Sequence, residues 1–351
     1  MKICYFGNYN PELSRNKIYS KGLKENGVEI IECRDSSHGL SKFWQLYLKH
    51  LKIKCTYDVL IVGYPGHSMV PLAKLLSTKP VVFDALCTSW EGEALSHGVP
   101  LWRRLKARIV DFLAVKISDI ILLESEQQKK FFAERFGKSE KYKVVYTGVD
   151  DSVFFRESSI PLNKKFTVLF RGRLTPEAGV EYVLEGAEIL KNEDILFKII
   201  GFGQMETEVK EELKKLNLPN VELITKELSN DSLRKEMCGC HISLGQFGNN
   251  ERLKRTIPHK AFESLAMGIP YITANAEGVA EIFTVGETCL FVNKADPKDL
   301  AEKILTLKNN PALRNKLALN GRKLYEEKLT PKILGETILK YILESKHDEY
   351  R

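Results

Sequence analysis

The sequence predicts an α/β protein of two domains, each built as a parallel β-sheet wrapped by helices. Two observations lead to this prediction. The chain has 351 residues, which exceeds the size at which a single hydrophobic core keeps growing. Short apolar runs alternate with helical segments, and this alternation restarts after a polar, proline-containing stretch at residues 156–165. Strands that alternate with helices are typical of parallel sheets.

The predicted strands are short runs rich in branched and aromatic residues. In the first half they are 2–7, 57–64, 80–86, 119–125 and 143–149. In the second half they are 166–173, 196–203, 221–226, 242–248, 270–275 and 289–293. From about Asp299 onward the pattern is helical.

The domain boundaries follow from this pattern. We expect an N-terminal domain at 1–155, a C-terminal domain at 156–325, and a C-terminal helix at 326–351 that packs back on the first domain. Two α/β domains that face one another leave a cleft at the carboxyl ends of their strands, where ligands of open α/β sheets bind. We therefore expect the functional site in this cleft.

Composition favours an ordinary globular protein, with 43% hydrophobic and 28% charged residues. The amino terminus enters directly as a strand and shows no signal-peptide pattern, so we expect a cytoplasmic protein. The seven cysteines form no C-x-x-C pair and have no partnered histidine spacing, which predicts no metal site. The net charge of +7 is spread along mixed-sign helices, and no nucleic-acid motif is present.

The segment from 166 to 190 reads as strand, tight turn and helix. Its turn carries Gly172 and Arg173. Glycine lets the backbone approach a ligand closely, a helix start offers N–H groups, and arginine offers two-pronged contacts to phosphate oxygens. This pattern fits a diphosphate; the alternative is an ordinary turn with a surface arginine. Gly201 and Gly203 form a weaker glycine pair, which packing of strand against helix also explains.

The stretch from 255 to 270 reads as a helix without a capping side chain. Pro258 fits the first helical position and Ile257 precedes it. Side chains lean toward the amino end of a helix, so Glu263 points toward this uncapped start. A carboxylate accepts hydrogen bonds, which suits the vicinal hydroxyls of a ribose beside bound phosphates. The alternative is a surface ion pair between Glu263 and Lys260.

Four ordered motifs resemble a known family: residues 144–154, 172–179, 199–204 and 259–274. Together they resemble the retaining family 4 glycosyltransferases of GT-B fold, the glycosyl transferases group 1. The resemblance runs over essentially the whole chain. It implies two Rossmann-like domains that face each other across a cleft, a nucleotide-sugar donor held mainly by the second domain, and an acceptor held mainly by the first. It also implies retained anomeric configuration, no metal and no cofactor apart from the nucleotide-sugar co-substrate, which is a UDP- or GDP-sugar.

The resemblance also assigns candidate site residues. Arg173 would contact the donor diphosphate together with Gly172 and Gly203, Glu263 would bind the ribose, and the backbone at Ile257 and Pro258 would line the phosphate and sugar site. The base would lie near Thr225 and Lys226. In the first domain, the residues expected to face phosphate or acceptor are Ser14, Arg15, Asn16 and Asp84.

Two departures from the family pattern concern charge. Ala178 stands where relatives carry a lysine, and Arg255 stands where they carry a glutamate. One cation is lost and one is gained, so we expect Arg255, or Lys260 on the same helix, to supply the missing charge. The alternative for Arg255 is a solvated basic turn.

Two stretches of the first domain, 42–54 and 99–116, mix apolar and basic residues at helical spacing. Such helices lie at membrane interfaces, which is compatible with peripheral membrane contact and a lipid-linked acceptor. The alternative is ordinary packing on the sheet.

The expected function is sugar transfer to a glycan, lipid-linked or small-molecule acceptor in the synthesis of cell-surface glycoconjugates. One alternative is a non-catalytic nucleotide-sugar-binding subunit, motivated by Ala178 and Arg255. The other is a sugar-nucleotide epimerase of the same architecture, which would need a histidine and carboxylates gathered in the cleft.

Overall fold

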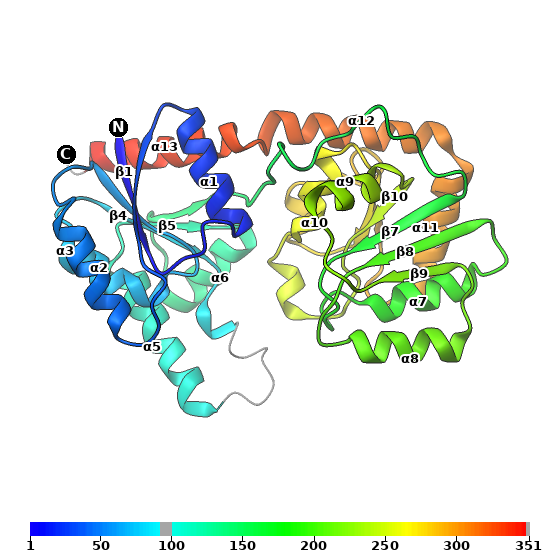
Figure 1. Ribbon diagram of the computed structural model, residues 1–351, viewed down its shortest axis with the longest axis horizontal. Coiled ribbons are helices and arrows are strands. Elements are labelled where there is room, and N and C mark those ends of the chain that lie inside the picture. The colour runs from blue at the N-terminus through cyan, green and yellow to red at the C-terminus, as the bar shows by residue number, and fades with distance from the viewer. Residues whose placement is uncertain (92–99, 349–351) are drawn as a thin grey trace. The chain divides into compact units, whose positions relative to one another are not determined.

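The computed structural model describes residues 1–91 and 100–348 and divides into two compact units (Figure 1). The first unit comprises Met1–Gly148 and Thr330–Arg351, and the second comprises Val149–Leu329. The predicted boundaries at 155/156 and 325/326 therefore lie a few residues from the observed ones. Val99 of the predicted interfacial stretch and residues 349–351 of the predicted C-terminal segment lie outside the described residues.

The described residues of the first unit form a parallel sheet of order β2-β1-β3-β4-β5-β6. Its strands are β1 (Lys2–Gly7), β2 (Glu29–Arg34), β3 (Val59–Val62), β4 (Val81–Leu86), β5 (Ile120–Leu123) and β6 (Tyr142–Val144). The strand order reverses between β1 and β3, where a crevice opens at the carboxyl edge of such a sheet.

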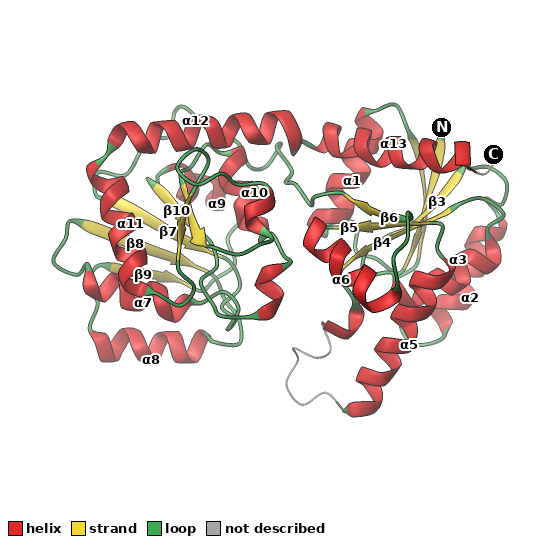
Figure 2. Cartoon of the chain, turned by 180° about the vertical axis from the view of Figure 1, so that it is seen from behind, coloured by secondary structure: helices red, strands yellow, loops and turns green. Residues whose placement is uncertain are grey.

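Helices cover both faces of this sheet (Figure 2). Those described are α1 (Ser14–Glu25), α2 (Ser41–Leu51), the short η1 (His67–Met69), α3 (Val70–Leu76), α5 (Leu101–Ile117), α6 (Glu126–Phe136) and α13 (Pro331–Asp348). Buried residues of α1 and α13 share one core cluster, and those of α2, α3, α5 and α6 share another.

The C-terminal helix α13 packs tightly on α1. A Cβ placed on Gly22 would lie 1.9 Å from the carbonyl oxygen of Pro331, and one on Gly335 would lie 2.3 Å from that of Gly22. Glycine therefore lets the two backbones touch at this crossing.

The second unit is another parallel sheet within the described residues, of order β12-β11-β10-β7-β8-β9. Its strands are β7 (Phe166–Arg171), β8 (Ile195–Ile200), β9 (Val221–Ile224), β10 (Ile242–Leu244), β11 (Tyr271–Ala274) and β12 (Leu290–Val292). This is the strand order of a Rossmann sheet, and it reverses between β7 and β10.

The helical segments of the second unit lie between these strands or, for α11 and α12, after the last of them. They are α7 (Val180–Ile189), α8 (Glu206–Leu216), α9 (Asn230–Cys238), η2 (Glu251–Lys254), α10 (His259–Ala266), η3 (Val279–Glu281), α11 (Pro297–Asn309) and α12 (Pro311–Lys328). Buried residues of β7, β8, β10, α7 and α11 form the main core cluster.

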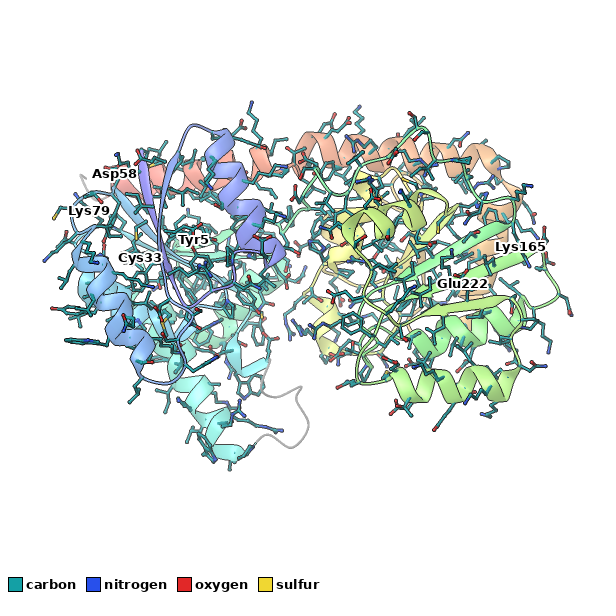
Figure 3. The ribbon with its side chains drawn as sticks, viewed as in Figure 1. Tyr5, Cys33, Asp58, Lys79, Lys165 and Glu222 are labelled. Carbon is teal, nitrogen blue, oxygen red and sulfur yellow. The ribbon has the colours of Figure 1, made fainter. Side chains whose placement is uncertain are left out.

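The edge strand β2 was not predicted from the sequence. Cys33 is the one buried residue of this strand, whose sequence EIIECR is half charged. Its side chain belongs to the core cluster that contains Cys4 and Phe6 of β1, whereas Tyr5 belongs to the other core cluster of this unit (Figure 3). Because an edge strand is shielded on few sides, it lacks the continuous apolar run that identified the central strands.

Candidate functional site

The strongest candidate site lies at the carboxyl edge of the second unit's sheet, where β7 and β10 part. Ligands of open α/β sheets bind at such a point. The loop after β7 begins with Gly172, whose φ is +145°, and the loop after β10 begins with Gly245. A Cβ on Gly201, after β8, would lie 1.9 Å from the Gly172 carbonyl oxygen. Glycine at position 201 therefore lets the loops after β7 and β8 pack backbone on backbone, whereas a Cβ on Gly245 would meet the side chain of Thr273.

Lys260 lies in the middle of this edge. A Cβ on Gly172 would come within 3.0 Å of Lys260 Cε and 3.1 Å of Nζ. The Nζ atom donates to the Gly245 carbonyl at 3.1 Å and lies 3.9 Å from the centre of the Phe170 ring. Burial and, to a smaller extent, Arg171 lower the pKa of Lys260 from 10.5 to about 7, although Glu263 acts in the opposite direction. An anion at this edge would favour the charged form.

Glu263 lies one turn further along α10 and is 1% exposed. Its Oε1 accepts hydrogen bonds from Arg171 of β7 and from His259 Nδ1, the latter at 2.9 Å. Oε2 is buried and has no hydrogen-bond partner among the described residues. Burial would raise the pKa of Glu263, but Arg171 and His259 outweigh it and lower the pKa to about 2. The side chain is therefore a carboxylate with one oxygen left to accept a further hydrogen bond.

This pairing differs from the sequence-based alternative. The ion-pair partner of Glu263 is Arg171, 92 positions away along the chain, in place of Lys260 on the same helix. Arg171 was not predicted as a site residue, because an arginine that ends an apolar strand looks like a surface residue.

Helix α10 begins without a capping side chain. Pro258 is its N-cap, with φ −64° and ψ 139°, so the helix starts at His259, one residue later than predicted. Ile257 is buried beside it, and Pro258 also lines a small pocket with Gln246, Thr256 and Thr273. The uncapped helix start thus lies next to the loop after β10.

The four positions that concern the missing cation differ in their surroundings. Ala178 is 2% exposed and belongs to the main core cluster, so a lysine there would have to displace core side chains. Arg255 follows η2, and its charge influences the pKa of Glu251 and of Lys254. Arg173 is exposed. Lys260 is thus the candidate cation that lies against Gly172.

Thr225 and Lys226 directly follow β9, the edge strand of this sheet. Gly203 lies in the loop after β8 with φ +157°, and a Cβ on it would meet the Leu174 carbonyl oxygen at 2.5 Å. The loops after β7 and β8 are joined by hydrogen bonds, including Leu174 N to Phe202 O at 3.0 Å. The predicted donor residues of this unit therefore lie in loops at one edge of its sheet, directly before α10 or, for Glu263, in α10 itself.

In the first unit, Arg15 and Asp84 form a buried ion pair. Arg15 Nε donates to Asp84 Oδ1 at 2.7 Å, and Nη1 donates to the Val145 carbonyl at 3.1 Å and to Thr147 Oγ1 at 3.2 Å. The side chains are 3% and 0% exposed. Burial raises the pKa of Asp84, although Arg15 and His67 act in the opposite direction.

This arrangement changes the interpretation of the predicted phosphate-facing segment. Arg15 holds Asp84, and the side-chain amide of Asn16 contacts the backbone of Asn10 and Tyr64 and the hydroxyl of Tyr5. Both side chains therefore hold the interior of the first unit together, and their contact with phosphate stays a prediction. Ser14, the first residue of α1, is partly exposed.

His67 is a further site residue that was not predicted from the sequence. It follows β3, its Nε2 donates to the Cys87 carbonyl at 2.8 Å, and the same atom lies 3.9 Å from Asp111 Oδ1. Burial lowers the pKa of His67 against the opposing influence of Asp111 and Asp84. No sequence spacing links these residues, since the carboxylates lie on β4 and α5.

A pocket of about 330 Å³ opens beside His67. Its lining comprises Pro65, His67, Ser68, Ser89, Trp102, Arg103, Lys106, Ala107 and Val110. It combines polar groups of the strand ends with apolar and basic side chains of α5.

Residues 152–324 match the family model described as Glycosyl transferases group 1. The chain carries a glycosyl transferases group 1 domain. This match confirms the resemblance found in the sequence. The matched residues include the whole β7–β10 edge described above.

Two curated relatives resemble the chain in sequence. The Capsular polysaccharide biosynthesis glycosyltransferase CapM of Staphylococcus aureus is 27% identical over 243 residues, which cover 63% of this chain and 60% of CapM. The Uncharacterized glycosyltransferase MJ1178 of Methanocaldococcus jannaschii is 29% identical over 227 residues, 65% of this chain and 60% of that protein. The chain thus spans about 60% of the length of the curated relatives it matches.

Solved structures share the fold. Anabaena Alr3699/HepE in complex with UDP-glucose aligns with a TM-score of 0.72 at 15% identity, over 98% of this chain and 100% of that one. Sucrose-phosphate synthase from Thermosynechococcus elongatus aligns with a TM-score of 0.73 at 12% identity, over 100% of both chains. Two parallel sheets with helices, in this order, are the GT-B fold, as predicted.

Neither a membrane-spanning helix nor a metal-ligand cluster is found in the part of the chain that the structure describes. Stretches 42–54 and 99–116 correspond largely to α2 and α5 of the first unit.

Proposed function

We propose that this protein is a glycosyltransferase that moves a sugar from a nucleotide-sugar to an acceptor, with retained anomeric configuration and without a metal. The observation that supports this most directly is the position of Lys260. A buried lysine pressed against Gly172 at the switch point of a Rossmann sheet is a cation site for phosphate oxygens. The match to glycosyl transferases group 1 supports the same conclusion.

The donor is a nucleoside diphosphate sugar in this proposal. Lys260, Arg173 and the uncapped start of α10 at Ile257 and Pro258 hold the diphosphate. Glu263 accepts from the ribose hydroxyls through its unpartnered Oε2. The base lies toward Thr225 and Lys226. HepE, which shares the fold, was solved in complex with UDP-glucose, and this favours a UDP-sugar over a GDP-sugar as the first candidate.

The chemistry follows from the bond that breaks. Departure of the nucleoside diphosphate from the anomeric carbon places negative charge on its terminal phosphate oxygen, so cations and N–H dipoles aimed there lower the barrier. Lys260 is suited to this role because its pKa of about 7 rises when an anion binds, which holds the ammonium form in place. With retention, the acceptor oxygen forms its new bond on the face that the diphosphate leaves, and its proton passes to the departing phosphate oxygen.

The acceptor binds to the first unit in this proposal. The pocket beside His67 offers a neutral imidazole, the Ser89 hydroxyl and the basic side chain of Lys106. Asp84 and Ser14 lie near the same sheet edge. A glycan, a lipid-linked glycan or a small polar molecule all carry the hydroxyl groups such a pocket would bind, as in the synthesis of cell-surface glycoconjugates. In this proposal the protein is cytoplasmic and contacts the membrane peripherally through the first unit. It has no nucleic-acid partner.

One observation favours a second candidate, a sugar-nucleotide epimerase. His67 has two carboxylates near it, those of Asp84 and Asp111, which is the gathering such an enzyme requires. Both carboxylates are committed, however. Asp84 holds Arg15, and Asp111 accepts from the backbone of Ser89 and Trp90. Sugar transfer therefore remains the better explanation.

The test is nucleotide release from the purified full chain with UDP-, GDP-, ADP- and dTDP-sugars, in the presence of EDTA. We expect slow hydrolysis of one donor, at least 100-fold slower in Glu263→Ala. Conversion of a donor to its epimer would replace this proposal with the epimerase. Binding without any turnover, also with acceptor mixtures present, would favour the non-catalytic subunit suggested by Ala178 and Arg255.

A further inference from the structure

Helix α5 of the first unit exposes a continuous apolar stripe. The side chains that form it are 44% to 82% exposed. They are Leu101, Trp102, Leu105, Ile109, Phe112 and Leu113. At about 100° per residue these positions fall on one side of the helix. The opposite side is buried and made largely of small residues, including Ala107 and Ala114. The stripe is therefore turned away from the core that α5 covers.

The charge that borders this stripe is positive. Helix α5 is fully described and carries five basic residues, of which Lys106, Arg108 and Lys116 lie within or next to the stripe at about 100° per residue, Arg103 lies further round, and Arg104 falls on the buried side. Its one acidic residue, Asp111, is 1% exposed and bonded to Ser89 and Trp90. No exposed acidic side chain of α5 thus offsets its basic border.

Helix α2 extends the same surface. Trp44, Leu48 and Leu51 are 38% to 61% exposed on one side of it. This helix, also fully described, has no acidic residue and carries Lys42 and Lys49. A groove of about 460 Å³ joins the two helices, lined by Leu40, Lys42 and Phe43 from one side and by Lys106, Val110 and Leu113 from the other. Both views of the fold show α2 and α5 on the same face of the sheet (Figures 1 and 2).

An anionic lipid surface is the partner that fits this chemistry. Large apolar side chains flanked by arginine and lysine are typical of helices that lie in the bilayer interface, where apolar groups enter the acyl boundary and cations meet phosphate headgroups. Other exposed apolar side chains of the described helices, such as Leu319 of α12 and Leu343 of α13, stand apart from such a cluster. Single exposed apolar residues are normal on soluble proteins.

We propose that the α2–α5 face, defined by the residues above, docks on an anionic bilayer with the α5 stripe inserted at the interface. This docking surface specifies the membrane contact included in the proposed function. Only the biological role of docking rests on that function. Docking itself requires no sugar transfer, so vesicle binding and nucleotide release test the two proposals separately.

The experiment is flotation of the full chain with vesicles of phosphatidylcholine alone or with one third phosphatidylglycerol. We expect binding to the anionic vesicles, at least tenfold weaker binding to the neutral ones, and release by high salt. Insertion should also shift the emission of Trp102 and Trp44 to the blue, and brominated lipids should quench it.

Matched variants locate the contact. Trp102→Glu with Phe112→Glu should reduce binding to anionic vesicles at least tenfold, and Lys106→Glu with Lys116→Glu should remove most of its salt dependence. The control Leu319→Glu with Leu343→Glu also replaces two exposed apolar side chains by glutamate, on α12 and α13. It should leave binding unchanged. Circular dichroism and thermal unfolding confirm that each variant is folded.

Three results would overturn the proposal. Equal binding to neutral and anionic vesicles would remove the role of charge. Unchanged binding of the stripe variant, when folded, would place the contact elsewhere. A concentration-dependent dimer that the stripe variant abolishes, without vesicle binding by the wild type, would assign the face to a second copy of this chain.

Discussion

Each unit holds an arginine–carboxylate pair at the carboxyl edge of its sheet, and the two pairs behave differently. In the first unit, burial raises the pKa of Asp84 despite Arg15. In the second, Arg171 and His259 outweigh burial and lower the pKa of Glu263 to about 2. Arg15 is 3% exposed at its side chain, whereas that of Arg171 is 28% exposed. The first pair is sealed inside the fold, and the second is open on its arginine side.

The surroundings of the two pairs explain the difference. Two basic side chains, Arg171 and Lys260, act on each other or on Glu263. The exposed Arg173 follows Gly172 in the loop after β7, so this edge of the second unit carries more basic than acidic side chains among these residues. Near Asp84 lies His67, whose pKa burial lowers, and Asp84 and, to a smaller extent, Glu124 raise the pKa of the buried Arg15. An edge with excess cations is suited to an anion such as a diphosphate, whereas an edge whose one arginine is matched by carboxylates is suited to neutral hydroxyl groups. We therefore expect the arginine–carboxylate pair to serve structure in the first unit and ligand binding in the second.

Removal of the carboxylate from each pair should give the largest contrast in stability. Asp84→Leu leaves Arg15 buried and unpaired and should cost roughly 3–5 kcal/mol of unfolding free energy. Glu263→Leu should cost about half as much, because Arg171 reaches solvent. Urea unfolding of both variants measures this. Equal losses would show that the second pair is as sealed as the first.

Donor affinity should depend on pH through Lys260. Its pKa of about 7 in the free protein should rise in the complex, because the diphosphate stabilises the ammonium. Binding then takes up a proton above pH 7, so affinity falls as pH rises, by roughly tenfold between pH 6.5 and 8.5. Calorimetry with an intact nucleotide-sugar, which does not itself titrate in this range, measures the trend. A flat profile would show that Lys260 is not at the diphosphate.

Much of the fold could be read from the sequence, but only part of the site. Apolar runs located the central strands because these are buried on both faces, whereas β2, exposed at an edge, carries three charges in six residues. Glycines marked the loop after β7, since Gly172 and Gly201 must let backbones touch. Contacts between distant parts of the chain carry no local signal. Three such contacts are the pairing of Arg171 with Glu263, the buried ion pair of Arg15 with Asp84, and the carboxylates around His67.

Arg255→Ala should have the smallest effect. Its charge influences Glu251 and Lys254, and it is Lys260 that lies against Gly172. We expect donor affinity and turnover within about threefold of the wild type, less than any effect above. A tenfold loss of donor affinity, with unchanged stability, would show that Arg255 contacts the diphosphate.

The decisive comparison for the diphosphate site is donor affinity of Lys260→Met at pH 7, with Lys254→Met as the matched control. Lys254 is a nearby cation paired with Glu251 at 2.8 Å. We predict that Lys260→Met binds the nucleotide-sugar roughly 100-fold more weakly, about 2.7 kcal/mol, and that the control binds as the wild type does. Unchanged affinity of a folded Lys260→Met protein would contradict the claim that this edge of the second unit holds a diphosphate.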